Sequence, residues 1–333
     1  MRILEEHWRA TTPPLPDTHR DWFVEETPRW ISYLADAIDL AHPRFFIDYM
    51  AWTKIVAISR GMQPEQLARQ LSALSNALAQ RLEPREADAA GRLVGEVLAQ
   101  LPSMPVEPTE AIPMDAPQAA LARTYLETLL KGERQAASAL ILRAADSGVS
   151  VKDIYLEVFQ PVMHEIGRLW QQNRIGVAME HYCTAATQMT MSQLYPRIFS
   201  TQRNGGSIVA ACATGELHEL GVRMVSDFFE MDGWDTFYLG ANSPAEAIVD
   251  TLGNRNAQVL ALSATLVCHL AGIRKLIRRV RGTPGLATTR IMLGGHPFAA
   301  TPDLWREFGA DGHACDARQA LELGNLWLKG GAA

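Results

Sequence analysis

The sequence predicts a fold of the α/β plus all-α class, in which helical domains precede a five-stranded, doubly wound (flavodoxin-like) parallel sheet. Three observations predict it. Apolar residues recur at helical spacing up to about residue 199, five prolines lie within residues 102–117, and short apolar runs alternate with helical patterns after Gly206. A chain of 333 residues is too long for one ordinary domain. We expect an N-terminal helical domain over 1–101, a Pro-rich linker over 102–117, a four-helix bundle over 118–200 and an α/β domain over 205–330.

Helical periodicity recurs four times in the N-terminal domain. Apolar stripes run over residues 30–41, 45–56, 67–82 and about 86–101. Pro64 is expected at the start of the third helix, where a missing N–H costs nothing. Five prolines in residues 102–117 cannot continue a helix, so this segment is predicted to be a semi-rigid linker.

A second helical block is predicted for residues 118–200. Its connections are short, which favours a bundle of antiparallel neighbours. The expected helices end near residues 132 and 148, run over 151–169 with a bend at Pro161, and run over 177–198.

The last part of the chain alternates strands with helices. Ser243 is expected to cap one of these helices, with Pro244 at its first position. Such alternation predicts a parallel sheet, and ligands bind these sheets at the carboxyl ends of the strands. The predicted strands are Ile208–Cys212, Phe237–Leu239, Val259–Ser263, Ile291–Leu293 and Gly312–Ala314.

Polar residues and glycines follow three of these strands. Glu216 precedes His218 by two residues and can accept its second ring N–H, an arrangement that fixes a metal-binding tautomer. Glycines allow backbone to approach a helix start or a bulky ligand tail closely. The candidates are Glu216, His218 and Gly221 after the first strand, Ser263 and Thr265 after the third, and Gly294 and Gly295 after the fourth.

This order resembles the cobalamin-binding domain of methionine synthase and the corrinoid proteins, whose pattern is Asp-x-His-x-x-Gly, then Ser-x-Leu or Ser-x-Thr, then Gly-Gly. Glu216 departs from it, because the family has Asp there. The resemblance covers about residues 118–330. It implies that His218 replaces the nucleotide base on the lower face of cobalt, and that the base is threaded past Ser263, Thr265, Gly294 and Gly295.

The bundle carries a second pattern, Trp170 followed by Glu180-His181. It is similar to the cobalamin photoreceptors, light-sensing repressors with a MerR-type DNA-binding domain. The resemblance implies adenosylcobalamin as chromophore, Trp170 over the upper face, Glu180 on the adenosyl ribose, and His181 on cobalt after photolysis. Imidazole suits cobalt and a carboxylate suits vicinal hydroxyls. The structural alternative is a tryptophan that closes a helix core and a surface Glu-His pair.

The N-terminal region departs from that photoreceptor family. Residues 1–110 carry eleven Lys and Arg against sixteen Asp and Glu, which opposes direct binding to nucleic acid. The region is rich in aromatic residues, as expected of a helical core or a dimer interface. A sharper hypothesis is that His42 to Trp52, with Arg60, resembles the globin-like module of the photocobilins. This implies a bilin such as biliverdin, for which Arg29, Arg44, Lys54 and Arg60 offer cations.

Three functions fit these patterns. The first is a light sensor, not an enzyme, that signals to an unknown protein partner; the second is a corrinoid methyl carrier for separate methyltransferases; the third is cobalamin storage or delivery. Substitution of His181 separates the first two. The chain has no apolar run of membrane-spanning length and no signal peptide, and its four cysteines lack a CxxC pattern, so a cytoplasmic location is expected. The aromatic-rich N-terminal region and the helical cap favour a homodimer.

Overall fold

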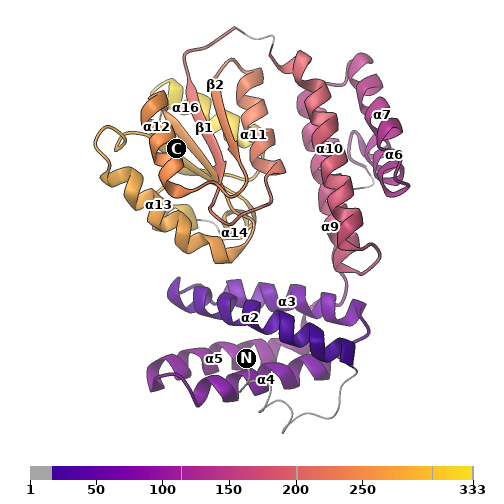
Figure 1. The fold of residues 1–333 in the computed structure, drawn as a ribbon, viewed down its shortest axis with the longest axis vertical. Helices are drawn as coiled ribbons and strands as arrows, with labels where there is room; N and C mark the ends of the chain where they lie inside the picture. Colours follow the sequence, from indigo (N-terminus) through magenta and orange to yellow (C-terminus); the bar gives the residue numbers. More distant parts are fainter. Residues whose placement is uncertain (1–16, 114, 200–201, 302, 332–333) are drawn as a thin grey trace. The chain divides into compact units, whose positions relative to one another are not determined.

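The computed structural model describes residues 17–113, 115–199, 202–301 and 303–331 (Figure 1). They divide into two compact units. One comprises the chain up to Glu110 together with Gly167–Val177, and the other comprises Ala111–Ile166 together with the chain from Ala178 onward. The division passes through a helix, so the first unit is not one continuous segment of sequence.

The first unit is helical, as predicted. Pro64 and Pro84 each occupy the first turn of a helix, and Gln63 N–H donates to Gln66 Oε1 at 2.7 Å in a capping box. Trp30, Phe46 and Leu67 are buried in the core. A globin packs eight helices, whereas the described part of this unit has four long ones before the linker. The elements are α2 (Asp17–Asp39), α3 (Arg44–Ser59), α4 (Pro64–Ala79), α5 (Pro84–Gln100) and the short η1 (Leu101–Ser103).

The predicted four-helix bundle is also present. Its third rod is not a simple bent helix, because a π-helical stretch directly precedes Pro161. Proline lacks an N–H for the carbonyl of Glu157 and its ring crowds that carbonyl, and the wider π turns accommodate both effects. The bundle consists of α6 (Ala119–Leu130), α7 (Arg134–Asp146), the rod made of α8 (Val151–Asp153), η2 (Ile154–Phe159) and α9 (Gln160–Gln171), and α10 (Val177–Ile198).

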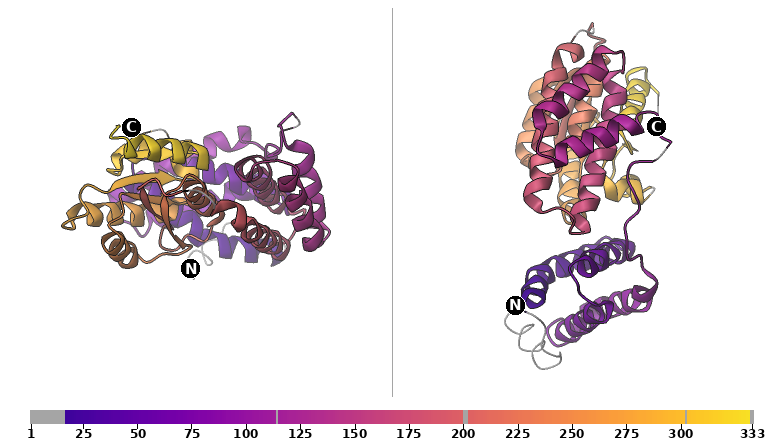
Figure 2. Two further views of the ribbon diagram at one scale, coloured as in Figure 1. Left: turned by 90° about the horizontal axis from the view of Figure 1, so that it is seen from above. Right: turned by 90° about the vertical axis from the view of Figure 1, so that its right-hand side faces the viewer.

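Five parallel strands form one sheet in the order β2-β1-β3-β4-β5, which confirms the flavodoxin-like prediction. Helices cover both faces of the sheet, α11 and α16 on one face and α12 and α13 on the other (Figure 2). The strands are β1 (Ser207–Cys212), β2 (Asp235–Gly240), β3 (Val259–Ser263), β4 (Arg290–Gly294) and β5 (Gly312–Ala314). The helices are α11 (Leu220–Met231), α12 (Ala245–Arg255), η3 (Val267–His269), α13 (Leu270–Gly282), α14 (His296–Ala300), α15 (Leu304–Glu307) and α16 (Ala317–Leu328).

Two local details of this domain differ from the prediction. Pro244, rather than Ser243, occupies the N-cap position of α12, and no side chain of the described residues caps this helix there. The Ser243 hydroxyl donates to the Gly240 carbonyl at 3.2 Å instead. The short helices α14 and α15 between β4 and β5 were not expected. Within the described residues, no helix is both long enough and apolar enough to cross a membrane.

Candidate functional site

The loop between β1 and α11 presents His218 at the carboxyl end of the sheet. Glu216 is fully buried, and its Oε1 lies 2.5 Å from the ring Nδ1 of His218. The same oxygen accepts a hydrogen bond from the backbone N–H of His218 at 2.9 Å. The His218 side chain is 59% exposed. Since the carboxylate engages Nδ1, Nε2 is the ring nitrogen that His218 offers to a ligand. The contact expected from the two-residue spacing is therefore present.

The second oxygen of Glu216 fastens this loop to the one after β3. Glu216 Oε2 accepts the backbone N–H groups of Thr265 at 2.7 Å and Leu266 at 3.2 Å. Burial by itself would raise the pKa of Glu216, but the hydrogen bonds from His218 and Thr265 lower it to about 2. Glu216 is therefore ionised at neutral pH. Its hydrogen bond raises the pKa of His218, and the Glu180 carboxylate adds a smaller effect in the same direction.

Strand pairing aligns the remaining predicted residues of the sheet. Cys212 pairs with Ser263, and Ser263 pairs with Gly294, so β1, β3 and β4 end at one level. The Ala264 N–H donates to the Gly294 carbonyl at 3.1 Å. Ser263, Thr265 and Gly294 thus share the edge of the sheet from which the His218 loop rises.

The predicted glycines differ in what surrounds them. Gly295 has a φ of +99°, and a Cβ there would lie 1.9 Å from the Ala264 carbonyl oxygen. Its lack of a side chain is therefore required by the protein's own backbone. At Gly221 a Cβ would meet no atom of the described residues within 4 Å. Gly221 leaves open space at the start of α11, beside the His218 loop.

A second carboxylate in this loop was not predicted. Glu219 Oε1 accepts from Gln188 Nε2 of α10 at 2.6 Å, and its Oε2 accepts from Tyr238 Oη at 2.9 Å and from the Ala241 N–H at 3.0 Å. Glu219 lies just before α11 and Gln188 lies within α10, and no motif links the two in the sequence, so the sequence contains no sign of their contact. The contact joins the bundle to the loop that carries His218.

Glu180 and His181 lie in the first turns of α10. His181 Nδ1 is 2.6 Å from Glu180 Oε2, and the Thr184 hydroxyl donates to Glu180 Oε1 at 3.1 Å. The His181 side chain is 74% exposed and the Glu180 side chain is 31% exposed. Both histidines of the prediction are thus held through Nδ1 by a neighbouring carboxylate.

Trp170 belongs to the other compact unit. Its ring stacks on that of Trp52, with centroids 5.8 Å apart, and the Arg60 guanidinium lies 5.7 Å from its centroid. The structure accordingly groups Trp170 with aromatic residues of the N-terminal helices.

The cations proposed for bilin propionates are mostly engaged elsewhere. Lys54 is 2% exposed, and its ammonium donates to the carbonyls of Leu101 and Met104 at 2.7 Å each. Because it closes the end of α5, Lys54 cannot serve a propionate, and the prediction for this residue is wrong. Arg44 pairs with Asp48 at 3.1 Å, and Arg29 pairs with Glu26.

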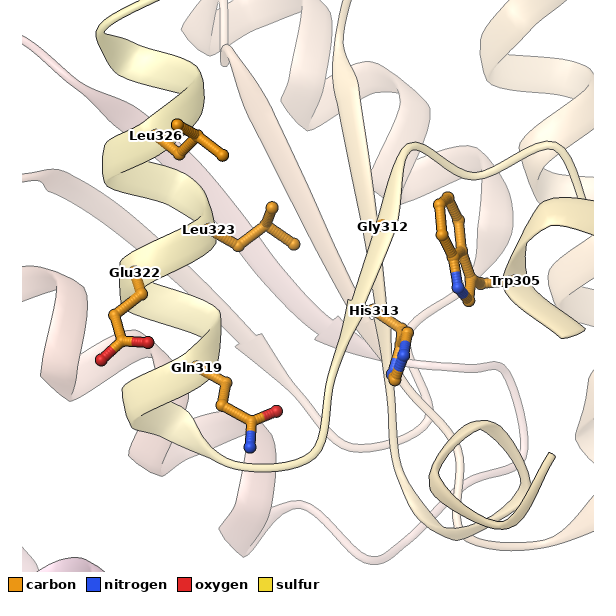
Figure 3. Close-up of a pocket in the computed structure, with 7 residues that line it drawn as sticks. All are labelled: Trp305, Gly312, His313, Gln319, Glu322, Leu323 and Leu326. Carbon is orange, nitrogen blue, oxygen red and sulfur yellow. The ribbon is translucent and has the colours of Figure 1, made fainter. Parts of the chain in front are cut away.

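A cavity of about 420 Å³ lies elsewhere on the α/β domain. It borders β5, the edge strand, which is three positions from β1 in the sheet. Leu323 and Leu326 extend from α16 toward β5, and the rings of His313 and Trp305 lie beside the strand (Figure 3). No predicted site residue lines this cavity.

Comparison with known proteins identifies the kind of domain that the chain carries. Residues 206–322 and residues 121–195 match two families, both described as B12 binding domain. Monomethylamine corrinoid protein 1 of Methanosarcina mazei is 27% identical over 55% of this chain and 86% of its own length. A corrinoid protein of Desulfitobacterium hafniense is 23% identical over 61% of this chain and 94% of its own. The chain therefore carries a cobalamin-binding module.

A solved structure supports the fold of the same region. The monomethylamine corrinoid protein of Methanosarcina barkeri superposes with a TM-score of 0.55 at 20% identity, covering 62% of this chain and 97% of that one. The donor set suits the cofactor: a neutral imidazole is a good cobalt ligand, and the buried Glu216 carboxylate fixes its tautomer.

Proposed function

We propose that the protein is a corrinoid carrier that holds cobalamin against His218 and exchanges methyl groups with separate methyltransferases. The observation that carries the proposal is the Glu216–His218 pair, which leaves Nε2 of a half-exposed imidazole at the sheet edge. When bound, cobalamin supplies a cobalt centre that accepts and donates methyl groups. The protein's own residues would hold and orient it, and the separate methyltransferases would catalyse the transfers, as the names of its corrinoid-protein relatives suggest.

The relatives favour this function over light sensing, which the Trp170 and Glu180-His181 pattern favours. Their names are those of corrinoid proteins, two of them linked to monomethylamine. We infer that the bundle covers the cofactor and that methyltransferases are the partners. A cytoplasmic location, homodimerisation and a bilin in the N-terminal unit remain predictions.

Light sensing is the second candidate, and the Glu180–His181 contact supports it. His181 is exposed and is held through Nδ1, as His218 is, so Nε2 is its available nitrogen. By this hypothesis adenosylcobalamin would be the chromophore and would supply a light-sensitive cobalt–carbon bond, and His181 would be the residue that holds cobalt after illumination. Trp170, the third residue of the photoreceptor pattern, lies among the N-terminal aromatics.

Cobalamin binding is tested first with the purified protein. The absorption spectrum of the loaded protein should show a histidine-bound, base-off form, and His218→Ala should lose it. Leu217→Ala is the matched control, because Leu217 is 72% exposed in the same loop. An identical spectrum in the His218 variant would exclude His218 as the lower ligand.

The two functions are then separated by His181→Ala. Methyl-loaded protein is mixed with a methyltransferase fraction from the same organism and a thiol acceptor, and a carrier should lose its methylcobalamin band whether or not His181 is present. The adenosyl-loaded protein is illuminated with green light. A stable bis-histidine product that is absent from His181→Ala would establish the sensor. If the parent and His181→Ala both give the same photoproduct as cofactor free in solution, the result supports the carrier.

A further inference from the structure

The bundle meets the α/β domain along one polar face of α11. Glu219 and Arg223 are four residues apart and therefore lie on the same side of the chain at the start of this helix. Arg223 donates to the Ser192 hydroxyl at 2.9 Å and the Tyr195 hydroxyl at 3.2 Å, both on α10. Together with Gln188–Glu219 these contacts form a hydrogen-bonded seam between α10 and α11, which lie side by side (Figure 1).

Glu219 occupies a special place in this seam because it directly follows His218. Its carboxylate collects three donors from three places: Gln188 on α10, Tyr238 on β2, and the backbone N–H of Ala241 after β2. On the opposite side of His218, Glu216 collects donors from the loop after β3. Two carboxylates therefore hold the His218 loop, and the one at Glu219 also bonds to the bundle.

The partner of Glu219 lies on the helix that carries the other candidate residues. Glu180, Thr184 and Gln188 are spaced by four residues along α10 and share one face. The Thr184 hydroxyl already bonds to Glu180, and Gln188 bonds to Glu219. The Gln188–Glu219 hydrogen bond therefore connects the helix face of Glu180 and His181 to the loop of His218.

We propose that Glu219 is a positioning residue of the cobalamin site, which through Gln188 holds α10 closed over the cofactor bound at His218. This inference rests on the proposed binding of cobalamin at His218. The contact is strong and local, since a hydrogen bond to a charged acceptor is worth more than one between neutral groups. Separation of Gln188 from Glu219 would loosen the first half of α10, because the Arg223 contacts hold this helix further along, at Ser192 and Tyr195. It would not alter the Glu216–His218 contact, which uses other atoms.

A charge exchange tests the contact without removing a side chain. Gln188→Glu places two carboxylates together. Glu219→Gln keeps a hydrogen bond, because the Gln188 amide can turn to face the new amide. The double variant restores an amide–carboxylate pair with the two groups exchanged. The measurement is the rate at which cyanide from solution binds the cobalt of the loaded protein. We expect a rate about tenfold higher in Gln188→Glu, equal to about 1.4 kcal/mol, and rates within about twofold of the parent in the other two.

The histidine-bound spectrum should persist in all these variants, which a general loss of structure would not allow. An unchanged cyanide rate in Gln188→Glu, or a double variant as fast as the single one, overturns the proposal. If Gln188→Glu fails to bind cobalamin, Gln188→Ala replaces it, with a rate about tenfold higher expected from the lost hydrogen bond to a charged acceptor.

Hydrogen exchange of the cobalamin-free protein separates this inference from the proposed function. Amides of residues 184–190 should exchange faster in Gln188→Glu and return to parental rates in the double variant. If neither the parent nor any variant binds cobalamin, the proposed function fails. Hydrogen exchange still tests whether the Gln188–Glu219 bond holds α10. Unchanged exchange in Gln188→Glu would show that the bond does not hold α10.

Discussion

The hydroxyl of Tyr155 in the bundle donates a hydrogen bond of 2.8 Å to Oδ2 of Asp227 on α11. Asp227 is 6% exposed. Burial raises its pKa to about 6, although the hydrogen bond from Tyr155 and the charge of Arg223 oppose the shift. The bundle and α11 are thus joined by the Asp227 carboxyl group, whose ionised form is disfavoured by burial.

This contact predicts how folding stability depends on pH. The pKa of Asp227 in the folded protein lies above that of an unfolded Asp. The stability that protonated Asp227 contributes is therefore fully present below about pH 4 and is lost as the pH rises through 6. Asp227→Asn should therefore raise the free energy of unfolding at pH 8 by about 2 kcal/mol and change it little at pH 4. Urea unfolding at both pH values measures this, and equal effects at the two would contradict it.

Glu216 should behave in the opposite way. Its folded pKa is depressed to about 2, so its contribution to stability is present above the unfolded pKa and is lost as pH falls toward 2. We expect Glu216→Gln to lower the free energy of unfolding at pH 7 by about 2 to 3 kcal/mol, and by less at pH 3. Urea unfolding of the cobalamin-free protein at both pH values measures the difference.

The same Glu216→Gln variant should lower the pKa of His218, because the hydrogen bond to Glu216 is the largest contribution to its rise. NMR titration of the His218 ring reports this directly. A pKa unchanged from that of the parent would mean that the two side chains do not interact in solution.

Lys54 is predicted to stabilise the first unit and to have no direct role in ligand binding. Lys54→Met keeps the apolar stem but leaves the buried carbonyls of Leu101 and Met104 without their donor. The expected loss of stability is about 2 to 3 kcal/mol, measured by thermal unfolding. Arg44→Met, at an exposed ion pair, is the control and should change stability by less than about 1 kcal/mol.

The two glycines near the site should respond differently to alanine. Gly295→Ala forces a Cβ against the Ala264 carbonyl at positive φ and should destabilise the protein by about 3 kcal/mol. Gly221→Ala meets open space, so the cobalamin-free protein should keep its stability to within about 1 kcal/mol. If cobalamin occupies that space, Gly221→Ala weakens cobalamin binding, as a titration followed by absorption would show.

Periodicity was sufficient to predict the helices and the five strands, because each buries a regular apolar pattern. It missed α14 and α15, which have five and four residues and are too short to show a period. It also missed the π-helical stretch before Pro161, since a change in helix type leaves the apolar pattern almost unaltered.

The site was predictable where its contacts are local in sequence. Glu216 and His218 are two residues apart, so their pairing follows from the loop alone. Gln188 and Glu219 are 31 residues apart, and their contact depends on the packing of α10 beside α11. Lys54 was misjudged for the same reason, because the carbonyls that bury it come from about fifty residues further along the chain.

The interrupted first unit has a consequence for protein engineering. Gln171 donates to the Trp52 carbonyl at 3.3 Å and accepts from the Ser59 hydroxyl at 2.9 Å, and Trp170 stacks on Trp52. A truncation after Glu110 would therefore remove Trp170 from Trp52, and each tryptophan would expose to water the surface that the other now covers. The two units are not interchangeable modules: a fusion or transplant of the N-terminal unit must include residues 167–177 to preserve its packing.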